Sequence, residues 1–367
     1  MAREPVTIYD VANLARVSIA TVSRVLNGSA QVRPATRERV ETAIAQLHFV
    51  PSSAARGLSG GRRGLLGLAY PLDEARSATT PSRGDDASAL YTDAIIRSAS
   101  WQAALLGYSL FSCAVRINEE IGVHPLQQLS DTVDGLILAD RVTNDPTALP
   151  FTKLLPTVHL SGSDASGSGG TIRVDNNGGI TAVVDHLATV HAINDFGFVG
   201  GVASSPDAIA RRSAFDAAVA RVRGTARPEN LLVGDFSLLR AEAAVEQRLA
   251  DASPLPQVFV CANDQMAFGV AHCLQVHDID VPRTVRVTGF DDIGLASYSQ
   301  PRLTTVAQPS FLLGISAVNL TVALLNGEVA HGTEITLPTE LKIRESCGCV
   351  NDERPPLLQG DFAHIGS

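Results

Sequence analysis

The stretch VTIYDVANLARVSIATVSRVLNG, residues 6–28, decides how the N-terminal end of the chain folds. Thr7 is followed three residues later by Asp10, the spacing at which a hydroxyl and a carboxylate cap the start of a helix. From Ile8 to Ala15 the apolar side chains recur three and four residues apart, as on one face of a helix. These residues therefore predict a capped amphipathic helix.

Two more helices are predicted to follow the first. Ser18 can cap the second helix, and residues 15–18 form a connection short enough for a helix-turn-helix. The third helix begins near Pro34, whose ring suits a first helical turn. The two helices add six apolar residues to a small core: Val22, Val25, Leu26, Val40, Ile44 and Leu47. The outer face of the second helix is then formed by Ile19, Ala20, Ser23, Arg24 and Asn27.

The charge of the chain is divided unevenly between its two ends. Residues 1–63 hold nine arginines and four acidic residues, a net charge of +5, whereas the remainder holds 20 basic and 34 acidic residues. A basic module joined to an acidic body is expected when only one end of a protein meets phosphates. Three-helix scaffolds and solvated basic surfaces are both common, so these features alone leave DNA binding and a purely structural domain as alternatives.

The string from Val6 to Gly28 closely resembles the DNA-binding headpiece of the lactose/galactose repressor family of bacterial transcription regulators. The resemblance implies that the second helix enters the major groove of double-stranded DNA. The base-reading residues are then Ile19, Ala20 and Arg24. The guanidinium of Arg24 can hold guanine O6 and N7, whereas the other two side chains offer only apolar contacts, for example to thymine methyl groups. The residues implied to hold the DNA backbone are Thr7, Tyr9, Ser18, Thr21, Ser23 and Asn27.

The headpiece departs from the family at Arg16, which stands where the turn usually has glycine.

The segment that follows the headpiece, PSSAARGLS at residues 51–59, is too short and too rich in small residues to form a helix alone in water, so its composition indicates a linker. In the resembling family this segment folds into a hinge helix on DNA. The resemblance therefore implies that Leu58 intercalates in the minor groove and that Arg56 contacts the groove or the backbone. Gly57 should weaken that helix.

After residue 63 short apolar strands alternate with helix-length segments, which predicts an α/β fold with doubly wound parallel sheets. The chain has 367 residues, 45% of them hydrophobic, which is enough for more than one domain. The predicted strands are 65–69, 109–113, 135–139, 157–160, 171–174, 196–200, 257–261 and 285–290. We expect a helix-turn-helix domain at 1–50, a hinge at 51–63, a core at 64–350 and a loosely ordered tail at 351–367.

Polar pairs follow three of these strands: Asp175-Asn176, Asn263-Asp264 and Asp291-Asp292. Parallel α/β sheets bind ligands at the carboxyl ends of their strands, so these pairs are candidate ligand contacts. Each has an ordinary alternative, because an Asp or Asn after a strand is most often a helix cap or a turn residue.

The strings VFVCANDQMAFGV, VRVTGFDDIGLAS and PRLTTVAQP resemble the same repressor family, whose core is similar to periplasmic sugar-binding proteins. This implies two lobes joined by three crossovers, lobe 1 at about 64–174 and 308–333 and lobe 2 at about 175–306 and 335–350. It also implies a homodimer on an imperfect palindrome and a small-molecule effector, with carbohydrate the first candidate and a nucleoside or purine the second. The implied effector-binding residues are Ser161, Val174, Arg211, Phe236, Asn263, Asp291 and Gln308.

The resemblance weakens at two places in the core. Ala192-Ile193 stands where the family usually has a Gly-His pair, and residues 73–89 form a longer, more polar loop than usual. Because that loop normally forms one wall of the pocket, the resemblance does not transfer a particular ligand to this chain.

Several kinds of chemistry lack a motif in the sequence. It contains no Walker A loop, no Gly-x-Ser-x-Gly elbow and no His-Glu-x-x-His helix, so we expect neither an enzyme nor a cofactor. The five cysteines form no disulfide framework, and Cys347-Gly-Cys349 lacks a second pair at zinc spacing, so we expect reduced cysteines and no metal. Without a signal peptide or an apolar run of membrane length, a cytoplasmic protein is expected.

Two rival functions remain open at this point. The core alone would also suit a solute-binding protein without a regulatory role, although residues 1–63 and the missing signal peptide speak against it. A sugar-modifying enzyme would need the adjacent carboxylates Asp291 and Asp292 to act together, and neighbouring residues on a loop usually point apart.

Overall fold

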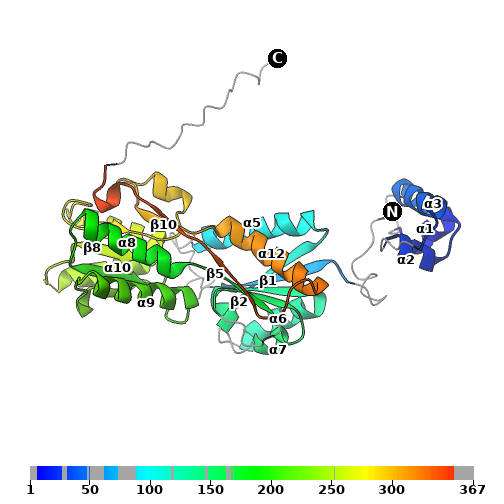
Figure 1. Ribbon diagram of the computed structural model, residues 1–367, viewed down its shortest axis with the longest axis horizontal. Coiled ribbons are helices and arrows are strands. Elements are labelled where there is room, and N and C mark those ends of the chain that lie inside the picture. The colour runs from blue at the N-terminus through cyan, green and yellow to red at the C-terminus, as the bar shows by residue number, and fades with distance from the viewer. Residues whose placement is uncertain are drawn as a thin grey trace, which may run out of the picture. The chain divides into compact units, whose positions relative to one another are not determined.

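A computed structural model describes residues 6–26, 31–47, 49, 62–72, 88–116, 120–144, 148–162, 167, 169–251 and 253–350. The chain divides into two compact units, Met1–Gly64 and Leu65–Ser367, which we treat separately (Figure 1). The predicted contacts of Asn27, Arg56 and Leu58, most of the 73–89 loop and the 351–367 tail lie outside the described residues.

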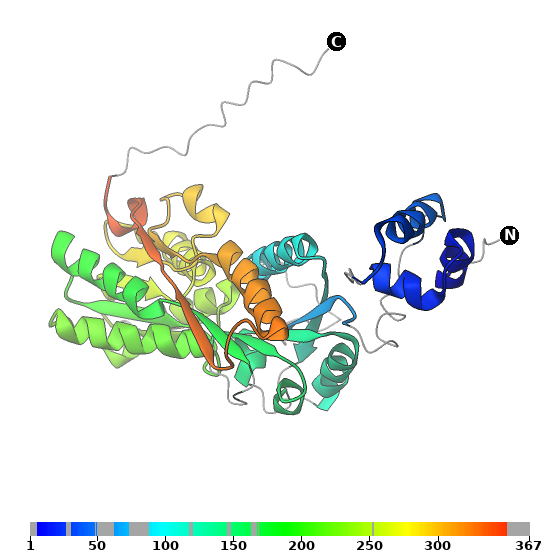
Figure 2. The ribbon, with the colours of Figure 1, turned by 45° about the vertical axis from the view of Figure 1, so that its right-hand side comes forward.

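The first unit is the predicted three-helix headpiece, with α1 at Ile8–Ala15, α2 at Ile19–Leu26 and α3 at Pro34–Leu47 (Figure 2). Its core is centred on Val11, Val22 and Val40, which are fully buried. The predicted cap of α1 is confirmed, because the backbone N–H and the hydroxyl of Thr7 both donate to Asp10 Oδ2, at 2.8 and 2.7 Å.

Lobe 1 of the second unit contains a parallel sheet in the order β11-β5-β4-β3-β1-β2. Helices α5 and α12 cover one face of this sheet, and α6 and α7 lie on the other (Figure 1). The strands are β1 Leu65–Leu72, β2 Ser109–Arg116, β3 Gly135–Ala139, β4 Thr157–Leu160, β5 Gly170–Val174 and β11 Thr333–Leu337. The helices are α5 Ser88–Leu105, α6 Glu120–Thr132, α7 Leu149–Thr152 and α12 Ser310–Asn326.

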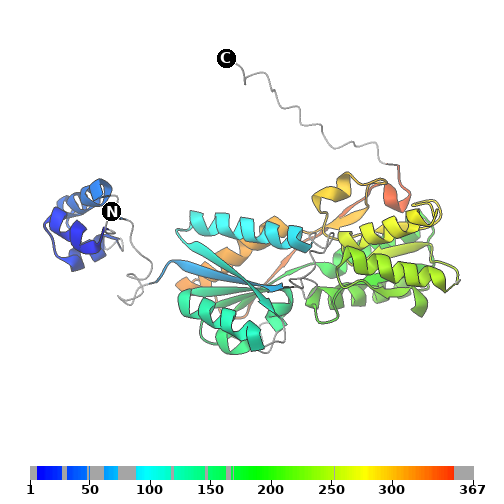
Figure 3. The ribbon, with the colours of Figure 1, turned by 180° about the vertical axis from the view of Figure 1, so that it is seen from behind.

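Lobe 2 contains a smaller parallel sheet in the order β7-β6-β8-β9. Its strands are β6 Phe196–Gly200, β7 Leu231–Val233, β8 Val258–Cys261 and β9 Arg286–Thr288. Its helices are α8 Asn176–Val190, α9 Pro206–Arg221, α10 Leu238–Ala250 and α11 Asp264–Val276, and a 3-10 turn, η5, spans Glu345–Cys347. The antiparallel pair β10 Thr305–Ala307 and β12 Glu340–Lys342 accompanies the chain as it passes between the lobes (Figure 3).

The structure corrects two of the expected boundaries. Strand β11 continues to Leu337, which pairs with Val174 of β5, so the third crossover follows Leu337 and does not lie between 333 and 335. Helix α5 begins at Ser88, so the last two residues of the predicted 73–89 loop are helical. Among the described residues, no helix combines the length and the apolar character needed to cross a membrane.

Candidate functional site

The outer face of α2 carries the three predicted base-reading residues. Ile19, Ala20 and Arg24 are exposed, whereas Val22 and Val25 on the opposite side are buried in the headpiece core. The core therefore fixes which side of α2 is exposed to solvent, and that side presents one guanidinium and two apolar groups.

Of the residues predicted to contact the DNA backbone, those that the structure describes lie on α1 and α2 or directly before them. Thr7, Tyr9 and Ser18 are exposed, and Thr21 and Ser23 are half-buried. Ser18 is also a cap, because its hydroxyl oxygen accepts a hydrogen bond from the N–H of Thr21 at 3.2 Å and lies 2.9 Å from the hydroxyl of Thr21. Thr7 and Ser18 thus lie at the starts of α1 and α2, where exposed N–H groups of a helix favour anions.

The turn between α1 and α2 has a left-handed residue at Arg16, with φ 52° and ψ 51°. A side chain in this conformation costs on the order of 1 kcal/mol relative to the glycine that the family uses. The N–H of Arg16 reaches Asn13 O at 3.2 Å, and the N–H of Val17 reaches Ala12 O at 3.0 Å, so the turn keeps a hydrogen-bonded helix end in spite of that cost.

In the second unit, a buried hydrogen-bond network surrounds Arg211 of α9. Its Nε donates to Asn176 Oδ1 at 2.8 Å, and one terminal nitrogen donates to Ala262 O at 2.6 Å and lies 3.4 Å from Asp291 Oδ1. The side chain of Gln308 donates to the same Asp291 oxygen at 2.6 Å. Three predicted effector residues, Arg211, Asp291 and Gln308, are therefore brought together at one point.

An aromatic ring forms the base of this network. The guanidinium carbon of Arg211 lies 3.7 Å from the centre of the Phe290 ring, a cation–π contact that is strengthened because both groups are withdrawn from water. The side chains of Arg211 and Asp291 are only 4% and 8% exposed. A charged pair buried to this degree is unusual unless each group is hydrogen-bonded, as here.

The network crosses from lobe 2 to lobe 1 through Asp207, which the sequence analysis did not identify. Asn176 donates to one carboxylate oxygen of Asp207 at 2.7 Å, and the hydroxyl of Ser161, directly after β4, donates to the other at 2.5 Å. Ser161, a predicted effector residue, thus joins the cluster through a residue of α9. No local signal marks Asp207, because its partners Ser161 and Asn176 lie 46 and 31 residues earlier in the chain.

The remaining predicted effector residues have more ordinary structural contacts. Asn263 caps α11 by accepting from Met266 N at 2.9 Å and donates to Phe236 O at 3.2 Å. Phe236 has φ 60° and packs its ring over Gly201, where a Cβ atom would come within 2.3 Å of the ring. Val174 is buried in the hydrophobic core of lobe 1.

The acidic residues that follow β8 and β9 have separate hydrogen-bond partners. Asp292 turns away from Asp291 and pairs with Arg344 at 2.7 Å, so the two carboxylates point apart as expected. Asp264 is fully buried and accepts from the N–H of Ile293 at 2.8 Å and from the hydroxyl of Thr305. Burial raises the pKa of Asp264 well above its ordinary value, and the charge of Asp291 adds to the effect.

The pKa of Asp291 leads to a prediction about stability. Burial raises this pKa from 3.8 to about 7, against the opposing charge of Arg211. The folded protein therefore holds a proton that the unfolded chain releases, so the contribution of Asp291 to the free energy of unfolding is present below about pH 4 and is lost as the pH rises through about 7. Asp291→Asn should remove this dependence, and urea unfolding at pH 5 and pH 8 measures it.

The free energy of unfolding of Asp291→Asn is expected to gain on that of the unsubstituted protein as the pH rises. The difference between the two proteins should therefore favour the variant more at pH 8 than at pH 5. Asp216→Asn, which alters an exposed ion pair with Arg212, is the matched control. An equal effect of Asp291→Asn at both pH values would contradict the buried, protonatable state of this carboxyl group.

Comparison with known proteins agrees with this architecture. Residues 7–52 match the model of bacterial regulatory proteins of the lacI family, and residues 184–347 match the periplasmic binding protein-like domain. The chain is 28% identical to catabolite control protein A of Priestia megaterium, over 93% of this chain and 99% of that protein. It is 30% identical to the HTH-type transcriptional repressor PurR of Haemophilus influenzae (strain PittEE), over 93% and 98% of the two lengths.

Solved structures show the same relationship. The lac repressor dimer bound to operator and the anti-inducer ONPF superimposes with a TM-score of 0.76 at 28% identity, covering 94% of this chain and 99% of that one. The complex of the transcriptional regulator CelR with cellobiose gives a TM-score of 0.67 at 25% identity, covering 93% and 99%. The chain therefore belongs to the lacI family of bacterial regulatory proteins, as a DNA-binding transcription regulator with a periplasmic binding protein-like core.

Proposed function

We propose that this regulator is a homodimeric repressor that binds an imperfectly palindromic operator. Its affinity for the operator would rise or fall when a small polar molecule binds between the core lobes. The observation that carries the DNA-binding part is the exposed face of α2, with Ile19, Ala20 and Arg24 opposite the buried Val22 and Val25. Two copies of this face related by a two-fold axis would read two half-sites of opposite orientation.

The effector site is proposed at the network of Arg211, Asp291 and Gln308. Gln308 is 7% exposed, and its side-chain carbonyl oxygen, although buried, has no hydrogen-bond partner among the residues that the structure describes. A buried acceptor without a donor costs about 1–3 kcal/mol, which a ligand hydroxyl would recover. The surrounding carboxylate, guanidinium and aromatic ring suit a polyhydroxylated ligand such as a carbohydrate, and the similar CelR was solved with cellobiose.

We further propose that the core acts as a sensor and not as an enzyme. The similar proteins named above are repressors, and the two adjacent carboxylates face different partners, Arg211 and Arg344. A sensor releases its ligand unchanged, so chromatography of the ligand after prolonged incubation with the protein should recover it intact. Conversion to a product would favour the enzyme alternative.

The dimer surface is proposed on lobe 1, where large apolar side chains remain exposed on α5 and α12. Trp101 and Phe311 are 53% and 55% exposed and lie against each other, with ring centres 6.3 Å apart. Leu105, four residues after Trp101 on α5, is 63% exposed and extends this set. Large apolar groups gathered in this way usually mark a protein interface.

Selection of random duplex DNA on the purified protein tests the proposal as a whole. Recovery of a palindrome would support a dimeric, sequence-specific regulator and would provide an operator for screening candidate effectors by their change in DNA affinity. Recovery of no motif at moderate salt, either alone or with a library of sugars and nucleosides, would contradict it.

Within that operator, Arg24→Ala is expected to reduce base discrimination at one position of each half-site by about 1–3 kcal/mol, because the bidentate donor to guanine is lost. Arg24→Lys is the matched control: it keeps the charge but not the fork, so overall affinity should survive better than base selection. Both effects are measured by competition with operators substituted at each position. An Arg24→Ala protein that still selects the same base would remove Arg24 from the base-reading set.

A further inference from the structure

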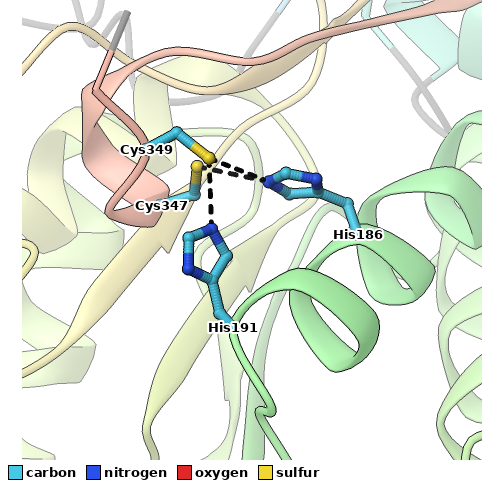
Figure 4. A group of neighbouring side chains, drawn as sticks. All are labelled: His186, His191, Cys347 and Cys349. Carbon is cyan, nitrogen blue, oxygen red and sulfur yellow. Dashed lines mark hydrogen bonds between the residues drawn. The ribbon is translucent and has the colours of Figure 1, made fainter.

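Four potential metal ligands converge in lobe 2, and none of them belongs to the Arg211 network. His186 and His191 come from the C-terminal end of α8, and Cys347 and Cys349 come from η5 and the residues after it. One ligating atom from each residue lies within 4.8 Å of all the others. Figure 4 shows both imidazole rings directing a nitrogen toward the two sulfur atoms.

We infer that these four side chains form a structural binding site for a transition metal ion of the Zn²⁺ type. Zn²⁺ prefers four tetrahedral ligands, and Cys₂His₂ is one of its common structural sets. Zn–S bonds near 2.3 Å and Zn–N bonds near 2.0–2.1 Å place neighbouring N and S atoms of a tetrahedron about 3.6 Å apart. The observed distances between Nε2 and Sγ are 3.5 Å for His186–Cys347, 3.5 Å for His186–Cys349 and 3.3 Å for His191–Cys349.

The end of helix α8 explains how two histidines five residues apart reach one point. Within a continuous helix their side chains would diverge by about 140°. The helix ends at Val190, His191 is its C-terminal cap, and Ala192 has φ 53°, so the chain turns directly after the second histidine. The two rings then lie edge to face, with centres 5.1 Å apart.

The Cys347-Gly-Cys349 segment is shaped in a comparable way. Gly348 has φ 98° and ψ 2°, a left-handed conformation that a residue with a side chain rarely adopts, and it lets both cysteines face the histidines. The Nε of Arg286 donates to Cys347 O at 2.9 Å and holds this backbone against β9. Both segments are therefore fixed by the protein before any ion binds.

The chemistry of the four groups favours a divalent ion. Two thiolates and two neutral imidazoles would neutralise a 2+ charge, so the half-buried cluster would carry no net charge. Since all four positions are filled by protein side chains, the ion would have no open position for substrate, and its role would be structural. It would tie η5 to α8 across 161 residues of sequence.

The sequence alone indicates no metal site, because Cys347-Gly-Cys349 has no second pair of cysteines at zinc spacing. The partner pair is His-x₄-His, a spacing that falls within the range seen in zinc sites, but it lies 161 residues earlier in the chain. Only the fold brings the two pairs together. The histidine spacing and the Cys347-Gly-Cys349 motif are therefore two local signals that the sequence alone does not join.

Titration of the reduced, metal-free full-length protein with Co²⁺ tests the site. We expect about one Co²⁺ per chain, with the visible absorption of tetrahedral cobalt and a thiolate-to-cobalt charge-transfer band, both removed by Zn²⁺. Cys349→Ser and His191→Ala should each abolish the charge-transfer band or lower the stoichiometry to near zero. Cys113→Ser and His331→Ala should change neither, because these residues belong to no group of potential metal ligands among the described residues.

Two measurements on the unsubstituted protein keep the test decisive if a variant fails to fold. Zn²⁺ should raise the melting temperature and should protect Cys347 and Cys349 from thiol reagents, and a chelator should reverse both effects. The proposal is overturned if no Co²⁺ binds with thiolate character, or if Cys349→Ser and His191→Ala bind it as the unsubstituted protein does. The same holds if Zn²⁺ leaves the reactivity of both thiols unchanged, as in a cluster joined only by thiol–imidazole hydrogen bonds.

Discussion

At pH 8, where Asp291 is ionised in the folded protein, replacement of Arg211 by methionine is expected to lower the free energy of unfolding of the core by about 3–5 kcal/mol, the usual cost of removing one partner from a buried ion pair. Arg211 is 4% exposed and donates to Asn176, Ala262 and Asp291. Methionine fills much of the same volume but donates no hydrogen bond, so three acceptors lose a donor in a region closed to water. Denaturant unfolding followed by circular dichroism measures the loss.

The neighbouring Arg212 provides a matched control on the same helix. Its ion pair with Asp216 is exposed, with side chains 40% and 52% accessible, so Arg212→Met should change the free energy of unfolding by no more than about 1 kcal/mol. Adding Asp291→Asn to Arg211→Met should restore part of the loss, because the buried carboxylate no longer lacks its partner. If Arg211→Met unfolds like Arg212→Met, the network does not hold the core together.

The second large effect is expected at the exposed aromatic pair of lobe 1. Trp101→Glu places a charge beside Phe311, on the surface proposed to bury these rings against a second copy. The variant should be a monomer by analytical ultracentrifugation. Because two linked headpieces bind an operator more tightly than one, its operator affinity should fall by about 10²–10⁴-fold.

Tyr298→Glu is the control for this experiment. Tyr298 is an aromatic residue of lobe 2 that is 73% exposed and lies outside the proposed surface, so a charge there should leave the dimer and its operator affinity intact. A Trp101→Glu protein that sediments as a dimer would place the interface elsewhere.

The headpiece was predictable because its signals are local. The Thr7–Asp10 cap, Ser18 at the start of α2 and Pro34 at the start of α3 each act on their own helix within a few residues. Prediction of the buried strands succeeded for the same reason, since each is a short apolar run bounded by polar residues. Four strands were missed. β7, β10 and β12 span three residues each, and the five residues of β11 alternate between half-buried and exposed until Leu337, so none of the four is a continuous apolar run.

The candidate site was predictable only in part, because its contacts join distant segments. The resemblance pointed to Arg211, Asp291 and Gln308, which the structure brings together. The link from Ser161 to Asp207 forms between lobes, so no property of either local sequence indicates it. The polar pair after β5 was predicted to be either a helix cap or a ligand contact, and its two residues differ: Asp175 caps α8 by accepting from Gly178 N, whereas Asn176 belongs to the network.

The side chains around Arg211 are already immobilised by one another. Holding a long side chain in one rotamer costs about 0.5–1.5 kcal/mol of entropy on binding. In this protein Arg211 and Gln308 are already held in one rotamer by their hydrogen bonds before a ligand binds. Calorimetry with any effector found should therefore report a small entropic penalty from the protein. A site preorganised in this way selects ligands by whether their hydroxyl groups fit fixed donors and acceptors, so close stereoisomers should differ widely in affinity.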